Sequence, residues 1–250
     1  MIRLDHNTNT VAKNKLIVAL DVDSAQRARE LVDILREFVG MFKIGSQLFT
    51  AAGPEIVREV VKSGGRVFLD LKYHDIPNTV AAAGIAATRL GVSIFNVHAA
   101  GGSEMMQRTA EAVSQVAATE GLERPSVIAV TVLTSIDGSV LSQIGVHSTP
   151  EDQVRTLALL AEASGMDGVV ASPREVSLVR ASVKKAGFLI VTPGVRPSGA
   201  FPEDQKRLAT PAQAMKAGAD YLVVGRPITA ARDPALAAQQ IAQQMEFCVV

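Results

Sequence analysis

From Lys15 onward, short apolar runs rich in Val, Ile and Leu alternate with longer, alanine-rich amphipathic stretches. The short runs are apolar throughout, which is typical of parallel strands that helices cover. We expect strands at 15–21, 41–45, 66–72, 93–99, 126–133, 167–172, 188–194 and 220–226. We expect helices at 24–37, 54–63, 77–90, 103–119, 151–164, 174–186, 211–217 and 234–245.

Prolines mark the places where these helices should begin. A proline at the first helical position costs nothing, because that N–H has no partner within the helix. Three of the starts, at 149–152, 172–175 and 210–213, also resemble capping boxes. The prolines that we expect at helix starts are Pro54, Pro77, Pro150, Pro173, Pro211 and Pro234.

Eight such βα units follow one another without a change of composition that would indicate a linker. At roughly 30 residues each, they predict a single-domain α/β fold, the (β/α)8 TIM barrel. A doubly wound open sheet is the alternative, but the first βα turn carries no G-x-G-x-x-G run. We expect residues 1–14 to be a polar N-terminal extension and residues 15–250 to form the barrel domain.

Composition excludes several classes of protein. The chain has 25 Lys plus Arg against 25 Asp plus Glu, and its pI is near 6.9. Proteins that bind nucleic acids or membrane surfaces usually carry a basic excess, so we expect neither partner. The single Cys248 excludes an internal disulfide and fits a reducing compartment. With no apolar segment of the length of a bilayer span or signal peptide, we expect a cytoplasmic protein.

The densest group of charges lies at the end of the third predicted strand, and in barrels the carboxyl ends of the strands carry the chemistry. Asp70 and Lys72 are two residues apart, so both point into the barrel mouth, where Lys43 on the neighbouring strand can reach Asp70. Asp75 follows in the next loop and completes an alternating array in a partly dehydrated place. A structural ion-pair network is the alternative, but buried charges are costly without a purpose.

A second group of residues predicts an anion site. Phosphate often binds barrels at the loops after the seventh and eighth strands, against a helix N-terminus. These loops carry Arg196, Gln205, Gly225 and Arg226. Glycine allows close backbone approach and arginine can bind phosphate oxygens in bidentate fashion. An exposed arginine beside a turn glycine is the alternative. The segment 194–209 is long and rich in Gly and Pro, so we expect a lid.

The remaining polar strand ends are less informative. Asp21 ends the first predicted strand, and Thr134 and Ser135 follow the fifth. The four histidines show no metal-ligand spacing, and the chain has no C-x-x-C or H-E-x-x-H run. His98, at the end of the fourth strand, is more easily explained as a hydrogen-bonded rim residue. The sequence therefore predicts neither a metal site nor a redox cofactor.

The run VFLDLKYHDIPNT at 67–79 resembles the signature of the orotidine 5'-phosphate decarboxylase family. A D-x-K-x-x-D run alone is shared with sugar-phosphate decarboxylases and synthases of the same superfamily. The continuation Ile-Pro-x-Thr, together with Arg196, Gln205 and Arg226, favours the orotidine family. The resemblance extends along nearly the whole barrel, through the segments 19–21, 42–45, 96–102, 131–135, 192–196, 204–207 and 223–226.

This resemblance implies a lyase of pyrimidine biosynthesis that converts orotidine 5'-monophosphate to uridine 5'-monophosphate and CO2, without metal or organic cofactor. It implies that Lys72, held by Asp70 and Asp75, protonates C6, while Lys43 orients Asp70. It also implies a homodimer in which Asp75, Ile76 and Thr79 enter the partner's site. The implied substrate-binding residues are Asp21, Lys43, Asp70, Ile76, Thr79, Thr134, Ser135, Arg196, Gln205, Gly225 and Arg226.

Two other functions compete with this interpretation. A metal-dependent sugar-phosphate decarboxylase or hexulose-phosphate synthase would use the same barrel, with a divalent ion stabilising an enediolate. A catalytically silent nucleotide-binding protein would use the phosphate site as a sensor. The Lys43–Asp70–Lys72–Asp75 set argues against the second alternative, since simple anion binding needs no carboxylates at that place.

Overall fold

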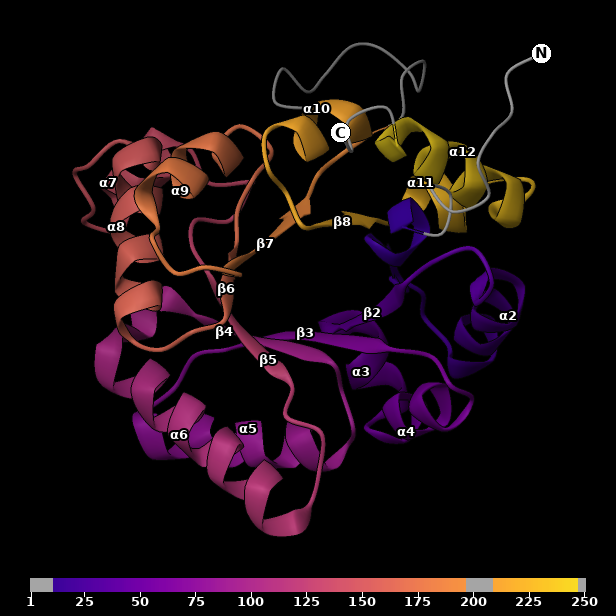
Figure 1. Ribbon diagram of the computed structural model, residues 1–250, viewed down its shortest axis with the longest axis horizontal. Helices are drawn as coiled ribbons and strands as arrows, with labels where there is room; N and C mark the ends of the chain where they lie inside the picture. Colours follow the sequence, from indigo (N-terminus) through magenta and orange to yellow (C-terminus); the bar gives the residue numbers. More distant parts are fainter. Residues whose placement is uncertain (1–10, 197–208, 247–250) are drawn as a thin grey trace.

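A closed parallel barrel occupies the centre of the molecule (Figure 1). The computed structural model describes residues 11–196 and 209–246. Each strand pairs with the next, and β8 pairs with β1, which confirms the predicted (β/α)8 TIM barrel. The strands are β1 (Leu16–Ala19), β2 (Met41–Gly45), β3 (Val67–Tyr73), β4 (Ile94–His98), β5 (Ser126–Val130), β6 (Gly168–Val170), β7 (Leu189–Pro193) and β8 (Tyr221–Val224).

Helices surround the barrel (Figure 1). Among the described residues, none of them combines the length and the apolar character needed to cross a bilayer. The long helices are α2 (Ala25–Leu35), α4 (Glu55–Lys62), α5 (Pro77–Arg89), α6 (Gly102–Glu120), α8 (Pro150–Ala163) and α12 (Pro234–Glu246). The shorter ones are α3 (Ser46–Ala52), η1 (Ala99–Gly101), α7 (Gly138–Gln143), α9 (Val176–Ser182), α10 (Pro211–Lys216) and α11 (Arg226–Thr229).

The short helices α3, η1, α7 and α11 were not expected from the sequence. All four directly follow a strand or lie in the loop after one, at the carboxyl ends of β2, β4, β5 and β8. A turn or two of helix lacks the repeated apolar periodicity by which a longer helix is recognised. These insertions extend the rim of the barrel at the end where chemistry takes place in this fold.

Prolines begin α5, α8, α10 and α12, as the sequence predicted. Thr149 caps α8, and Thr210 forms a full capping box with Gln213 at α10. Two expectations were wrong. Pro54 is the residue before α4 rather than its first residue. Pro173 precedes α9 by three residues, because residues 173–175 form a turn in which the backbone N–H of Glu175 donates to the Ser172 carbonyl. The Glu175 side chain accepts from the Ser172 N–H, which is one half of the expected capping box.

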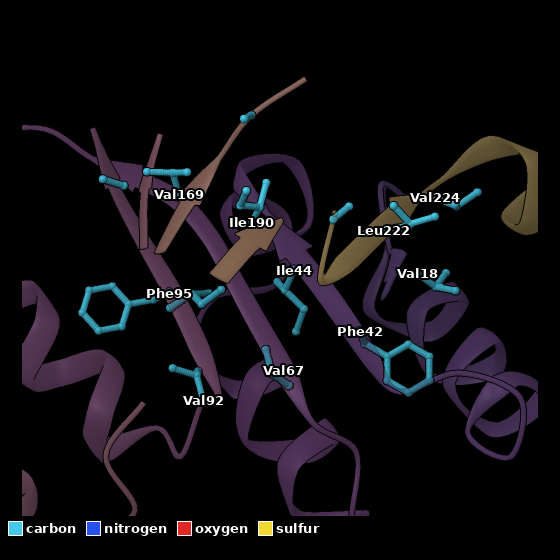
Figure 2. Close-up of a cluster of buried hydrophobic side chains, with 14 of the residues drawn as sticks. Val18, Phe42, Ile44, Val67, Val92, Phe95, Val169, Ile190, Leu222 and Val224 are labelled. Carbon is cyan, nitrogen blue, oxygen red and sulfur yellow. The ribbon is translucent and has the colours of Figure 1, made fainter. Parts of the chain in front are cut away.

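Alternate residues of each strand face the helices, and their apolar side chains form the larger core cluster (Figure 2). Val18, Phe42, Phe95, Ile190 and Leu222 come from five different strands, and all are almost fully buried. Because side chains alternate along a strand, the residues between them must point into the barrel. The side chains that the strands direct outward are apolar or aromatic, except for the buried Thr192 of β7.

The inner face is apolar toward the amino ends of the strands, whereas at the carboxyl ends it is polar on β2, β3 and β4 and apolar on β5, β6 and β7. A separate small cluster fills the interior at the amino ends, with Ile17, Met41, Phe68, Ile94 and Ile128 among its members. The inward positions that come next along β2, β3 and β4 are polar. They are Lys43, Asp70 and Asn96, and all three side chains are buried. The fold thus places a polar layer directly above an apolar floor.

Candidate active site

A cavity of about 480 Å³ opens at the carboxyl ends of the strands, within the size range of small-molecule sites. The inward positions of β1, β2, β3 and β8, or the residues directly after them, supply its polar wall. The members of this wall that the sequence had predicted are Asp21, Lys43, Asp70, Lys72 and Gly225. Phe68, Val130, Val170, Pro193 and Val223 form its apolar part.

Strand register brings the charged side chains together. Ala19 pairs with Lys43 between β1 and β2, and Gly45 pairs with Asp70 between β2 and β3. In a parallel barrel the strands are staggered, so side chains from neighbouring strands meet in one layer although their sequence distances are large. The predicted contact between Lys43 and Asp70 follows from this register and is confirmed.

The charges form a continuous chain of ion pairs. The Lys72 ammonium lies 2.6 Å from Asp70 Oδ1, and the Lys43 ammonium lies 3.3 Å from Asp70 Oδ2. Lys43 also donates to Asp21 Oδ1 at 2.9 Å. The order is therefore Asp21, Lys43, Asp70, Lys72, so negative and positive groups alternate. This series begins after β1, passes through Lys43 on β2 and ends with Asp70 and Lys72 on β3.

Burial makes this chain of charges interdependent. The side chains of Lys43 and Asp70 are only 10% and 12% exposed, whereas that of Asp21 is 52% exposed. Breaking a buried ion pair by removing one partner typically costs about 3–5 kcal/mol, because the other charge remains without compensation. Asp70 therefore depends on both lysines, and the cavity holds two ammonium groups at fixed places before any ligand binds.

The backbone at Lys72 has an unusual conformation. Its φ is +52°, which makes it the one non-glycine residue in the left-handed region among the described parts of the chain. Such a residue costs about 1–3 kcal/mol and persists only when its surroundings hold it there. The register between β3 and β4 shifts at the same place, between Leu69 and Tyr73. An irregularity of this kind re-aims the side chain that it carries.

Asn96 is a site residue that the sequence interpretation missed. It lies at an inward position of β4 and is fully buried. Its amide Nδ2 donates to Asp70 Oδ1 at 2.7 Å, and its Oδ1 accepts a hydrogen bond from the backbone N–H of Lys72 at 2.8 Å. An asparagine inside an otherwise apolar strand was the available signal, since buried amides are rare unless their hydrogen bonds are satisfied.

Asp75 does not join the array within its own chain, contrary to the expected convergence of four charges. It is exposed, and its Oδ1 accepts a hydrogen bond from the backbone N–H of Ile76 at 2.7 Å. Among the described residues, no ion pair connects it with Lys43 or Lys72. Thr79 is also exposed, and Ile76 is 67% exposed, which is high for a large apolar side chain.

The residues of the expected anion site are only partly assembled. Gly225 lines the cavity, and Arg226 is exposed at the start of α11. Arg196 is partly buried, and its backbone N–H donates to the carbonyl of Ala209 at 3.1 Å. Gln205 and most of the expected lid at 194–209 lie outside the described residues.

The loop after β5 lines part of the cavity, on the side of the barrel opposite β1. Thr134 lines it, as the sequence predicted. Ser135 is exposed and does not belong to the lining. Within the described ranges 11–196 and 209–246, no group of three His, Cys, Asp or Glu side chains lies close enough together to hold a metal ion. The two carboxylates of the cavity, Asp21 and Asp70, face lysine ammonium groups instead.

Two aromatic contacts lie beside the array. The His74 and His98 rings are 5.5 Å apart and tilted by 37°, while Tyr73 makes an edge contact with Phe95. Burial raises the pKa of the Tyr73 hydroxyl. Burial also lowers the pKa of His98, and the nearby charges of His74 and Lys72 lower it further, against an opposing effect of Asp70. These surroundings therefore favour the uncharged form of the imidazole at the end of β4.

Comparisons with known proteins agree on one family. A model of the "Orotidine 5'-phosphate decarboxylase / HUMPS family" matches residues 14–241. The orotidine 5'-phosphate decarboxylase of Moorella thermoacetica is 55% identical over 237 residues, which cover 94% of each chain. That of Geotalea daltonii is 52% identical over 238 residues, or 95% of this chain and 98% of the relative.

Solved structures agree with the sequence comparisons. The crystal structure of orotidine 5'-phosphate decarboxylase from Lactobacillus acidophilus superposes with a TM-score of 0.81 at 37% identity, and the match covers 92% of this chain and 98% of that one. The fold and the sequence therefore point to the same relatives over nearly the whole barrel.

His98 is expected to titrate below pH 6.5, because its surroundings disfavour the protonated form. As the pH falls through 6.5, the unfolded chain takes up a proton that the folded chain resists, so the free energy of unfolding should decrease. His74→Phe removes one cause and should raise the pKa of His98, which burial still keeps below 6.5.

An NMR titration of the imidazole protons measures the pKa of His98 in the unaltered protein and in His74→Phe. A His98→Gln variant identifies which signals belong to His98. A His98 pKa at or above 6.5 in the unaltered protein would contradict the arrangement described for this rim.

Proposed function

The chain belongs to the orotidine 5'-phosphate decarboxylase / HUMPS family, and on this premise we propose how its cavity carries out the reaction: Lys72 supplies the proton that replaces CO2, without metal or organic cofactor. The protein is a carboxy-lyase that decarboxylates orotidine 5'-monophosphate in UMP biosynthesis. The observation that carries the proposal is the 2.6 Å contact between the Lys72 ammonium and the buried carboxylate of Asp70.

The chemistry requires an acid beside C6 of the pyrimidine. The bond between C6 and the carboxylate carbon breaks, and its electron pair stays on C6 while CO2 leaves. That carbanion has little resonance stabilisation, so the barrier depends on nearby charge. The Lys72 ammonium would stabilise it and then transfer a proton to C6, after which the neutral amine regains a proton from water. A fixed cation in a partly dehydrated site needs no reorganisation at the moment of reaction.

Asp70 has two roles in this scheme. It holds the Lys72 ammonium in place through Oδ1, and its negative charge lies close to where the substrate carboxylate must sit. Two like charges in one site disfavour the bound substrate relative to the transition state, in which the carboxylate is leaving as neutral CO2. Lys43, which contacts the other oxygen of Asp70, would orient that carboxylate.

The remainder of the cavity would hold the ribose and the phosphate. Asp21 and Lys43 lie at the rim of the array, where their polar atoms can contact ribose hydroxyl groups. Thr134 and Ser135 would contact the pyrimidine edge from the loop after β5. The proposed phosphate-binding residues are Arg196, Gln205, Gly225 and Arg226. Binding energy from this remote group would contribute to assembling the charged array around C6.

A homodimer would complete the site. Asp75, Ile76 and Thr79 are exposed, and the Asp75 carboxylate does not contact its own chain's array. Burial of the exposed Ile76 side chain by a second chain would remove apolar surface from water and would bring the adjacent Asp75 to that chain. We place these three residues in the partner's site, where Asp75 would be the second carboxylate beside Lys72.

Domain boundaries and location belong to the same proposal. Residues 15–250 would form the catalytic barrel, with residues 1–14 as an N-terminal extension. The cytoplasmic location rests on the reaction itself, a step of nucleotide synthesis, and on the single Cys248, which fits a reducing compartment.

Lys72→Ala should lower kcat for orotidine 5'-monophosphate by at least about 10³-fold, because both the stabilising charge and the acid are lost. An ultraviolet absorbance assay follows the loss of substrate, and circular dichroism checks that the variant is folded. Lys62→Ala, at an exposed position of α4, is the matched control and should keep full activity. Turnover retained by Lys72→Ala would overturn the role of Lys72. Loss of the unaltered protein's activity in EDTA would favour a metal-dependent reaction instead.

Mixing two inactive variants tests the shared site. Asp70→Asn and Asp75→Asn each damage one contributor, and a hybrid dimer of the two has one site with both defects and one site with neither. Mixing should therefore restore activity, up to about a quarter of the unaltered level if subunits exchange at random and the sites act independently. Absence of restored activity, with subunit exchange verified by native mass spectrometry, would mean that Asp75 acts within its own chain.

A further inference from the structure

Asn96 is an uncharged side chain that hydrogen-bonds to both of the residues on which the proposed chemistry depends, Asp70 and Lys72. Its donor and its acceptor are used on different partners, the carboxylate of Asp70 and the backbone N–H of Lys72. The side chain comes from β4, whereas both partners lie on β3. It therefore connects two neighbouring strands at the layer of the charges.

The bond to Lys72 compensates for a missing strand contact. Between the paired positions Leu69–Phe95 and Tyr73–Val97, β3 advances by four residues while β4 advances by two. The regular ladder is interrupted there, so the N–H of Lys72 has no regular partner on β4. The Asn96 side-chain oxygen accepts this N–H at 2.8 Å. It thereby holds the backbone at the residue whose φ is +52°.

The bond to Asp70 orients the carboxylate. Asp70 Oδ1 accepts from Asn96 Nδ2 at 2.7 Å and from the Lys72 ammonium at 2.6 Å. Its other oxygen faces the Lys43 ammonium at 3.3 Å. The amide is fixed in the barrel interior and has no charge, so it restrains the carboxylate without neutralising it. A third lysine at this place would hold Asp70 as firmly but would add a positive charge to the array.

We propose that Asn96 is a positioning residue. Its one amide holds both the Lys72 backbone and the Asp70 carboxylate, and it thereby sets the distance and direction of the Lys72 ammonium relative to Asp70. The inference rests on the proposed function of Lys72 and Asp70 and adds to it a residue that acts through them. Asn96 makes no contact with substrate in this scheme. Its loss therefore changes how fast the bound substrate reacts rather than how well it binds.

The test compares Asn96→Ala with Thr109→Ala. Thr109 is equally buried and donates its hydroxyl to the Met105 carbonyl inside α6, away from the cavity. Asn96→Ala should lower kcat by about 10²-fold, the loss expected for a misplacement of about 1 Å. The KM for orotidine 5'-monophosphate should stay within about threefold, as should the affinity for uridine 5'-monophosphate. Thr109→Ala should keep kcat within about twofold, although it also loses a buried hydrogen bond.

A second variant keeps the inference testable if Asn96→Ala does not fold. Asn96→Asp retains the shape of the side chain and an acceptor for the Lys72 N–H, but replaces the donor to Asp70 by an oxygen. It should lower kcat by at least about tenfold at pH 8, where two carboxylates would face each other. A kcat within about threefold of the unaltered protein, in either folded variant, would overturn the inference. So would an equal loss in Thr109→Ala.

Failure of the proposed function gives a different result. If Lys72→Ala retained turnover, the proton donor would be misassigned whatever the Asn96 variants do. If Lys72→Ala is inactive and the Asn96 variants are fully active, the result supports the proposed role of Lys72 and contradicts only the positioning role of Asn96.

Discussion

The carboxylate of Asp70 is the group on which the rest of the cavity depends. It is nearly buried, and it accepts contacts from the ammonium groups of Lys43 and Lys72 and from the amide of Asn96. Desolvating a carboxylate is costly unless such partners compensate it. These contacts come from three neighbouring strands, so the closed barrel is what makes them possible. In return, the buried carboxylate fixes where the two ammonium groups lie.

Different parts of the barrel stabilise the fold and carry the charged side chains of the cavity. Its outer face and the floor of its interior are apolar, and they bury the side chains that stabilise the fold. At the carboxyl ends, the inner face is polar on β2, β3 and β4 and apolar on β5, β6 and β7. The irregular stretch of β3 at Lys72 stores a local strain there, which the surrounding contacts hold. Side chains held on strands in this way are positioned more precisely than side chains on loops.

The sequence was sufficient for the barrel because eight apolar runs and their helix-start prolines are local signals. It also placed Asp70, Lys72 and Lys43 together, since alternation along a strand and the adjacency of consecutive strands follow from the fold. The bulge at Lys72 could not be predicted, because a register shift depends on both strands and leaves no local pattern. Asn96 stood out as a polar residue in an apolar strand, but its two partners depend on that shifted register. Asp75 was misplaced within the chain because a loop residue has no periodicity to fix its direction.

The most direct measurement is a crystal structure of the protein with uridine 5'-monophosphate bound. The proposed mechanism requires C6 of the pyrimidine to lie within about 3.5 Å of the Lys72 ammonium, the separation at which atoms react. It also requires the phosphate to lie at Arg226 and the ribose to lie between Lys43 and Asp21. A nucleotide bound in the reverse direction, or one with Lys43 rather than Lys72 nearest to C6, would contradict the mechanism.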